Sequence, residues 1–184
     1  MTVLSVVEVP DPRLRTVCAP VTLVDDAVRA LAADMVETMY AASGIGLAAP
    51  QVGVLTRVVV IDLQERGDEA PVDDAEPAKE PERVRDPHVY INPELTWVSE
   101  ELSTYNEGCL SIPDQYAEVT RPERCRVRWL GEQGEGHEAE MGGLLATCMQ
   151  HEIDHLNGVL FTDHISRLKR DMIMKKLTKA RKAG

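Results

Sequence analysis

The stretch that organises the chain is Gln150-His151-Glu152-Ile153-Asp154-His155, near its C-terminal end. On a helix, residues four apart stand on one face about one turn apart, so His151 and His155 can bind the same metal ion. Glu152 lies beside them, where it can act on a metal-bound water without being a ligand. The pattern H-E-x-x-H therefore predicts a helix that carries a metal site. An ordinary charged helix surface gives the same residues by chance, so the surrounding sequence has to decide.

The composition is that of a single globular domain spanning residues 1–184. Its 43% hydrophobic and 28% charged residues are typical of a soluble protein large enough to bury a core. No export signal is visible, and no apolar run approaches the length of a membrane span. We therefore expect a cytoplasmic protein without membrane contact, whose four cysteines are thiols.

The charge is distributed unevenly along the chain. The formal net charge of −11 argues against binding of DNA, or of nucleic acid in general, by the body of the protein. Residues 169–184 carry seven Lys/Arg and one Asp, a local charge of +6 that leaves −17 on the remainder. Such a tail either contacts something anionic or simply faces water, where cations suit the C-terminal end of a helix.

Hydrophobic periodicity predicts an α+β fold. Helices are expected at residues 25–42, from about Gly142–Leu144 to Asn157-Gly158, and at about residues 165–182. Predicted strands are 57–63, 89–92, 95–102 and two within 116–130, divided at Arg121-Pro122. Residues 105–113 are predicted to form a tight loop. We expect antiparallel sheets around the central motif helix, followed by a C-terminal helix.

Residues 64–87 differ in kind from the rest of the chain. They hold nine Asp/Glu, four Lys/Arg and four Pro, with almost no large apolar side chain. Such a composition cannot build a core, so an acidic, Pro-rich, mobile surface loop is predicted. It is not a domain boundary, because the stretches on both sides are predicted strands of one sheet system.

Two histidines need a third protein ligand, which leaves one position for water. The H-E-x-x-H proteases take that ligand downstream of the motif. No Glu follows Glu152 here, and Phe161 stands where the pattern H-E-x-x-H-x-x-G-x-x-H requires its last His. Neither protease pattern is complete, so the third ligand is expected upstream.

The cysteines are the upstream candidates. Cys148 is on the motif helix but about 10 Å of rise from His155, which is too far for a short side chain. Cys18 and Cys125 lie in strand-like surroundings without polar neighbours. Cys109 follows a glycine, which lets the backbone approach closely, and a glutamate adds polar context. A Cys-His-His site would bind a divalent transition metal.

Three separate motifs resemble those of the peptide deformylase family. Gly44–Gln51 is similar to its first motif, G-x-G-L-A-A-x-Q, and Glu107–Ser111 to its second, E-G-C-L-S. Gln150–His155 is similar to the third, Q-H-E-x-D-H. The similarity extends from Pro10 to Phe161, apart from the acidic loop, and the three motifs occur in the family's order.

The resemblance implies a metal-dependent hydrolase that removes the formyl group from N-formylmethionyl peptides of newly synthesised proteins and releases formate. Cys109, His151 and His155 would hold one divalent metal ion. Fe²⁺ is the family expectation, although such a site also accepts Zn²⁺, Ni²⁺ or Co²⁺. Glu152 would take a proton from the attacking water. The Gln51 side-chain amide and the Leu110 backbone N–H would then donate to the oxyanion.

The resemblance also suggests where the substrate binds. Gly44 and Gly46 would let the backbone pair with an extended peptide. Ile45, Leu144 and Cys148 are candidates for the pocket that takes the methionine side chain, with ordinary core packing as the alternative.

Two features of the sequence depart from the family pattern. The acidic loop is longer than expected, and Tyr116 stands where some members carry Arg, which puts a substrate contact there in doubt. The basic tail resembles a ribosome-docking C-terminal helix known in some members.

An endopeptidase is the competing enzyme, and an inactive binding relative is the other alternative. The intact Glu152, Cys109 and Gln51 argue against an inactive protein.

Overall fold

A computed structural model of the chain describes residues 1–64 and 84–183. The described residues form α1 (Asp26–Ala41), α2 (Gly143–Leu156) and α3 (Arg167–Ala183), with seven strands and three short 3-10 turns. The strands are β1 (Gly46–Ala48), β2 (Val58–Ile61), β3 (His88–Val98), β4 (Leu102–Cys109), β5 (Ile112–Pro122), β6 (Arg124–Leu130) and β7 (Gly136–Gly142). The turns are η1 (Pro12–Arg15), η2 (Ala49–Val52) and η3 (Phe161–His164).

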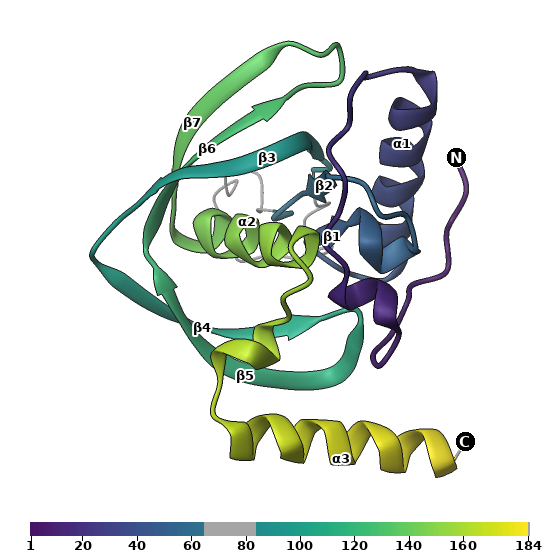
Figure 1. Ribbon diagram of the computed structural model, residues 1–184, viewed down its shortest axis with the longest axis vertical. Coiled ribbons are helices and arrows are strands. Elements are labelled where there is room, and N and C mark those ends of the chain that lie inside the picture. Colours follow the sequence, from purple (N-terminus) through teal and green to yellow (C-terminus); the bar gives the residue numbers. More distant parts are fainter. Residues whose placement is uncertain (65–83, 184) are drawn as a thin grey trace, which may run out of the picture.

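The motif helix α2 lies between two antiparallel sheets, as the sequence predicts (Figure 1). One sheet has five strands in the order β1-β2-β3-β6-β7, and the other is the β4–β5 hairpin. The α+β prediction with a central motif helix is therefore confirmed.

Strand β2 shows why the larger sheet is covered on both faces. All four of its residues are buried, as their β-branched run predicts. Val59 and Ile61 belong to the core formed with α2, whereas Val58 and Val60 belong to the core formed with α1. Because strand side chains alternate, this one strand supplies two cores.

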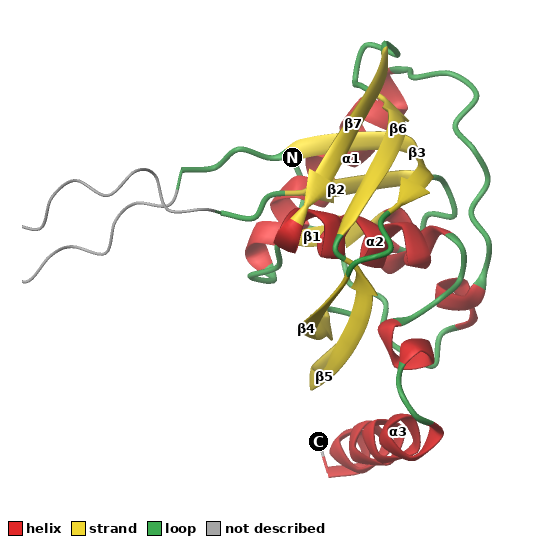
Figure 2. Cartoon of the chain, turned by 90° about the vertical axis from the view of Figure 1, so that its left-hand side faces the viewer, coloured by secondary structure: helices red, strands yellow, loops and turns green. Residues whose placement is uncertain are grey.

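The C-terminal helix α3 runs beneath β5, on the side of the hairpin away from α2 (Figures 1 and 2). Its Ile173 and Leu177 are buried in a third core that includes Val119 of β5 and Phe161 of η3. Apart from the half-buried Arg170, the cations of the helix are exposed, so α3 combines an apolar face that packs with a basic face that meets water.

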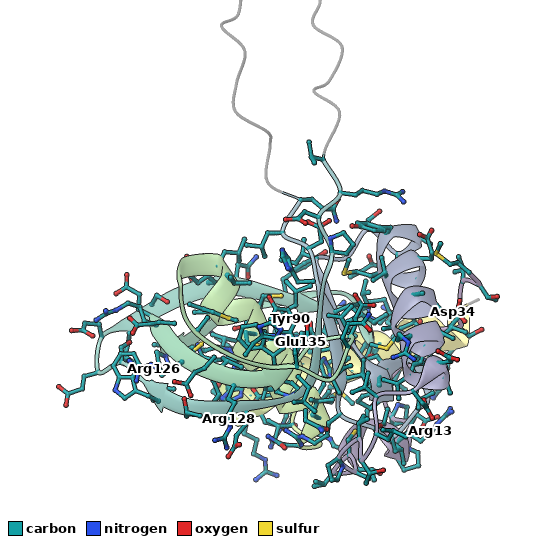
Figure 3. All side chains as sticks on the ribbon, turned by 90° about the horizontal axis from the view of Figure 1, so that it is seen from above. Arg13, Asp34, Tyr90, Arg126, Arg128 and Glu135 are labelled. Carbon is teal, nitrogen blue, oxygen red and sulfur yellow. The ribbon has the colours of Figure 1, made fainter. Side chains whose placement is uncertain are left out.

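The outward face of β6 illustrates how the larger sheet meets solvent. Arg126 pairs with Glu140 of β7, and Arg128 pairs with Glu94 of β3, on the side of the molecule far from α1 (Figure 3). These pairs are exposed and contribute little to stability.

Two local predictions are wrong. The strands predicted at residues 89–92 and 95–102 are not divided in that way, because β3 is one strand from His88 to Val98 and residue 102 begins β4. Residues 105–113 are not a single tight loop, because β4 continues to Cys109 and β5 begins at Ile112. Only Leu110 and Ser111 form the turn. The polar composition of this stretch reflects a hairpin in which exposed and half-buried positions alternate along the first part of β4.

Most of the predicted acidic loop, residues 65–83, lies outside the described residues. Its two flanks are held by one buried carboxylate, that of Asp62. The backbone N–H groups of Gln64 and Asp86 donate to it at 2.8 and 2.9 Å, and the Tyr40 hydroxyl donates as well. Within the described ranges, no helix combines the length and the apolar character needed to cross a membrane.

The end of α2 yields a stability prediction. Gly158 has φ of +73°, and a Cβ there would lie 2.5 Å from the Arg15 carbonyl oxygen. We expect Gly158→Ala to lower the free energy of unfolding by at least about 1–2 kcal/mol, because a left-handed backbone and a backbone clash both oppose the methyl group. Gly136→Ala is the matched control, since nothing lies within 4 Å of its Cβ position. Equal denaturant midpoints for the two variants would contradict this account.

Candidate metal centre

Three predicted ligands from two elements converge at one point. Cys109 ends β4, while His151 and His155 stand one turn apart on α2. Their ligand atoms all lie within 4.8 Å of one another. The Nε2 atom of His155 is 3.2 Å from both the Cys109 sulfur and Nε2 of His151. One sulfur and two imidazole nitrogens at this spacing fit a divalent transition metal.

A buried carboxylate fixes the orientation of one predicted ligand. Nδ1 of His151 donates to Glu107 at 2.9 Å, which leaves Nε2 directed at the metal position. Arg121 donates to both oxygens of the same carboxylate, at 2.6 and 3.0 Å. Burial opposes the charged form, but the hydrogen bonds from His151 and Arg121 outweigh it and lower the pKa of Glu107 to about 2. Glu107 is thus a permanent anion beneath the metal position.

The second predicted histidine ligand, His155, is held differently. Burial lowers the pKa of His155, which keeps its imidazole neutral, the form that binds a metal. Within the described part of the chain, its Nδ1 atom has no hydrogen-bond partner. Its orientation therefore comes from packing in the helix and from its neighbours at the metal position.

The carboxyl group of Glu152 lies deep in the site but outside the ligand set. Burial raises its pKa to about 7, even though the nearby His151 opposes that shift. Its Oε2 atom is buried and finds no hydrogen-bond partner among the described residues. A buried carboxyl group with this pKa and an unused oxygen is suited to accept a proton near neutral pH.

The side-chain amide of Gln51 faces the metal position from the other side. Its Oε1 atom accepts the Ala48 N–H at 2.9 Å, which fixes the orientation of the amide. Its Nε2 atom then lies 3.2 Å from the Ser111 hydroxyl and 3.4 Å from the Cys109 sulfur. This donor is fixed before any substrate binds, as oxyanion stabilisation requires.

The structure explains why residue 46 is a glycine, which the sequence alone did not. A Cβ at Gly46 would lie 2.5 Å from Oε1 of Glu152 and 2.9 Å from the Cys148 sulfur. The glycine therefore lets β1 approach α2 closely enough to bury Glu152. Backbone pairing with a peptide stays a prediction for this position.

A cavity of about 480 Å³ opens onto these groups. Of the residues nominated from the sequence, only His155 does not line this cavity. The lining residues among them are Gly44, Ile45, Gly46, Gln51, Cys109, Leu110, Leu144, Cys148, His151 and Glu152. Ile45 and Leu144 stay partly exposed at the cavity, whereas Cys148 is buried. Tyr116 also borders the cavity, with its ring against Gly108.

Sequence reasoning missed the residues behind the ligands. Glu107 was noted only as polar context, and Arg121 only as the break between two strands. A signal for Arg121 existed, because strand alternation places it on the same face as the buried Val119. A charged side chain on an inward face must be paired, and Glu107 is the partner.

Comparisons with known proteins give one consistent result. A family model described as polypeptide deformylase matches residues 3–171. A peptide deformylase of Rhizorhabdus wittichii is 61% identical over 183 residues, covering 100% of this chain and 98% of the relative. The crystal structure of a peptide deformylase from Legionella pneumophila has a TM-score of 0.84 at 40% identity, covering 99% of this chain and 97% of that one. A peptide deformylase of Ehrlichia chaffeensis, solved in complex with actinonin, has a TM-score of 0.83 at 40% identity, with 98% of each chain covered.

The buried carboxylate yields a prediction about metal affinity. Glu107→Gln keeps the size of the side chain but removes the charge that orients His151. We expect the dissociation constant for Zn²⁺ to rise by about 10- to 100-fold, the usual cost of losing such a partner. Glu118→Gln, on the exposed face of β5, is the control and should leave the constant unchanged. Unaltered affinity in the Glu107 variant, measured by competition with a chelating dye, would refute the orienting role.

Proposed function

The chain belongs to the polypeptide deformylase family, and from that premise we propose which of its residues carry the reaction and with which metal. It is a hydrolase that removes the N-terminal formyl group from N-formylmethionyl peptides of newly synthesised proteins and releases formate. The family is metal-dependent, and Cys109, His151 and His155 form a candidate metal site. The convergence of these three side chains is the observation that carries the proposal.

The proposed ligands are Cys109, His151 and His155. A divalent metal in this donor set supplies a Lewis acid that lowers the pKa of a bound water. Fe²⁺ is our proposal for the native ion, while Zn²⁺, Ni²⁺ and Co²⁺ suit the same donors. The thiol and the two imidazoles support this assignment, because soft sulfur combined with nitrogen favours such metals over Mg²⁺ or Ca²⁺.

Glu152 is the proposed proton carrier. It accepts a proton from the attacking water and passes it to the amine that departs with the peptide. Its burial and its raised pKa support both steps, because a carboxyl group with a pKa near 7 exchanges protons readily at neutral pH.

Gln51 and Leu110 are the proposed donors to the oxygen of the formyl group. Negative charge grows on that oxygen as the water attacks, and fixed donors stabilise it without reorganising. The bond from Ala48 to Gln51 supports this role, because it directs Nε2 toward the Cys109 side of the cavity. Leu110 follows Cys109 directly and lines the same cavity.

The peptide itself is proposed to bind along Gly44–Gly46. Backbone pairing gives affinity without sequence choice, which suits an enzyme that must accept many nascent chains. Ile45, Leu144 and Cys148 line the cavity and are the proposed contacts of the methionine side chain.

Replacing the proton carrier should separate metal binding from catalysis. We expect Glu152→Ala, purified anaerobically, to retain the iron content of the wild type, because Glu152 is not a ligand. Release of formate from formyl-Met-Ala-Ser should fall by about 10²- to 10⁴-fold, the usual contribution of general acid–base catalysis. Near-normal turnover of the variant would refute the mechanism. Zinc in place of iron in the anaerobically purified protein would refute the assignment of Fe²⁺ as the native ion. Cleavage of unblocked peptides by the wild type would instead favour an endopeptidase.

The ribosome is a proposed partner through the exposed cations of α3. The side chains of Lys175, Lys176 and Lys179 are exposed, and polyanionic RNA would attract them. A cytoplasmic location belongs to the same proposal, because the substrate is made on ribosomes there.

Charge reversal tests the ribosome proposal better than truncation does. Deleting residues 169–184 would also remove Ile173 and Leu177 from the core. We therefore expect Lys175→Glu, Lys176→Glu and Lys179→Glu, combined in one protein, to weaken cosedimentation with ribosomes severalfold at low salt. Turnover of a short formyl peptide should stay unchanged. The corresponding Lys→Arg protein is the control, and unaltered cosedimentation of the Glu protein would refute the proposal.

A further inference from the structure

The short turn η3 reaches the ligand His151 by two routes. Phe161 stacks on the His151 imidazole, with ring centroids 6.3 Å apart and an angle of 20° between the planes. At the other end of the turn, Nε2 of His164 lies 2.7 Å from Oδ2 of Asp154. The first contact acts on the face of the imidazole ring, and the second begins a chain of polar groups that ends at its edge.

The polar chain is continuous from the surface to the metal position. Oδ2 of Asp154, the oxygen bonded to His164, also accepts a hydrogen bond from Nη1 of Arg121 at 2.8 Å. The other two nitrogens of Arg121 donate hydrogen bonds to Glu107. Glu107 in turn accepts a hydrogen bond from Nδ1 of His151. Arg121 and Glu107 are each 5% exposed, whereas the His164 side chain is 35% exposed. His164 is therefore the more exposed end of a path that passes through Asp154, 22% exposed, to the buried Arg121 and Glu107.

The turn is anchored independently of this chain. Asp163 accepts the backbone N–H of Leu160 at 2.9 Å and is paired with Arg15 of η1. Phe161 is buried in the core beneath the β4–β5 hairpin. Because other contacts fix η3, His164 can hold Asp154 in place instead of following its movements.

We propose that His164 is a positioning residue for the metal ligand His151, acting through Asp154, Arg121 and Glu107. The physical reason is the shape of the guanidinium group. Its donors are coplanar and fixed relative to one another, so a shift at the Asp154 end tilts the end that holds Glu107. His164 occupies the second bonding position on the Asp154 oxygen and limits that shift. The inference rests on the proposed assignment of His151 as a ligand.

The rate of metal loss tests the inference directly. The full chain is loaded with Zn²⁺ and mixed with an excess of chelating dye, which reports release without any assay of activity. We expect His164→Ala to release Zn²⁺ about 3- to 10-fold faster than the wild type. This is less than the 10- to 100-fold effect typical of a partner bonded directly to a ligand. His164→Gln should release Zn²⁺ at nearly the wild-type rate, because its amide can still donate to Asp154.

A matched control separates this role from a general effect of losing a surface histidine. His137 is also a partly exposed histidine, with 42% of its side chain exposed, and it is paired with Glu135 at 3.0 Å. It lies on β7, outside the chain of groups that leads to His151. His137→Ala should leave the release rate unchanged, although it also removes a ring that stacks on Trp129. Neither His164 variant should alter the melting temperature of the metal-free protein.

Several outcomes would overturn the inference. Release from His164→Ala at the wild-type rate would do so, as would failure of His164→Gln to restore it. In a Glu107→Gln background, His164→Ala should add little, because the chain is already interrupted; full additivity would also count against the inference. A wild type that binds no Zn²⁺ would contradict the ligand assignment itself, which distinguishes failure of the proposed function from failure of this step.

Discussion

The architecture depends on one buried anion, the carboxylate of Glu107. A carboxylate that is removed from water is costly unless it is paired, and here a guanidinium and an imidazole surround it. These three groups come from β4, β5 and α2, so compensating a single charge fixes the hairpin relative to the central helix. Asp154 extends the arrangement, because it gives Arg121 a second carboxylate. The same hydrogen bond to Glu107 occupies Nδ1 of His151 and leaves its Nε2 atom directed at the metal position.

The site is assembled from parts that no single element supplies. Helix α2 contributes two imidazoles and a carboxyl group, β4 contributes a thiol, and η2 contributes the Gln51 amide. The N-terminal segment connects the last two, because Val7 donates its N–H to the Gln51 carbonyl at 2.7 Å and Val9 donates to the Ser111 carbonyl at 3.0 Å. An extended segment without catalytic residues thus sets the distance between the two loops that border the metal position.

The sequence predicted what local chemistry determines and missed what distant pairing determines. The three helices, β2 and the division near Arg121-Pro122 follow from periodicity and from turn residues, which act over a few positions. Residues 105–113, which hold the end of β4 and the start of β5, were mistaken for a loop because this polar, glycine-containing stretch gains its stability from strand pairing. The three proposed ligands could be nominated from motifs and from the chemistry of each side chain. The link from Arg121 to Glu107 could not, because fourteen positions separate two charges that meet only in the folded hairpin.

The Asp62 carboxylate has a consequence for how the chain can change over evolution. Gln64 and Asp86 both bond to it, so the two flanks of residues 65–83 meet at one point. The N–H of Asp62 donates to the Ile45 carbonyl at 2.9 Å, which ties that point to the edge of the cavity. These bonds join each flank to Asp62 directly, whatever the number of residues between the flanks. Insertion length at this position can therefore drift under weak selection while the cavity edge beside it stays fixed.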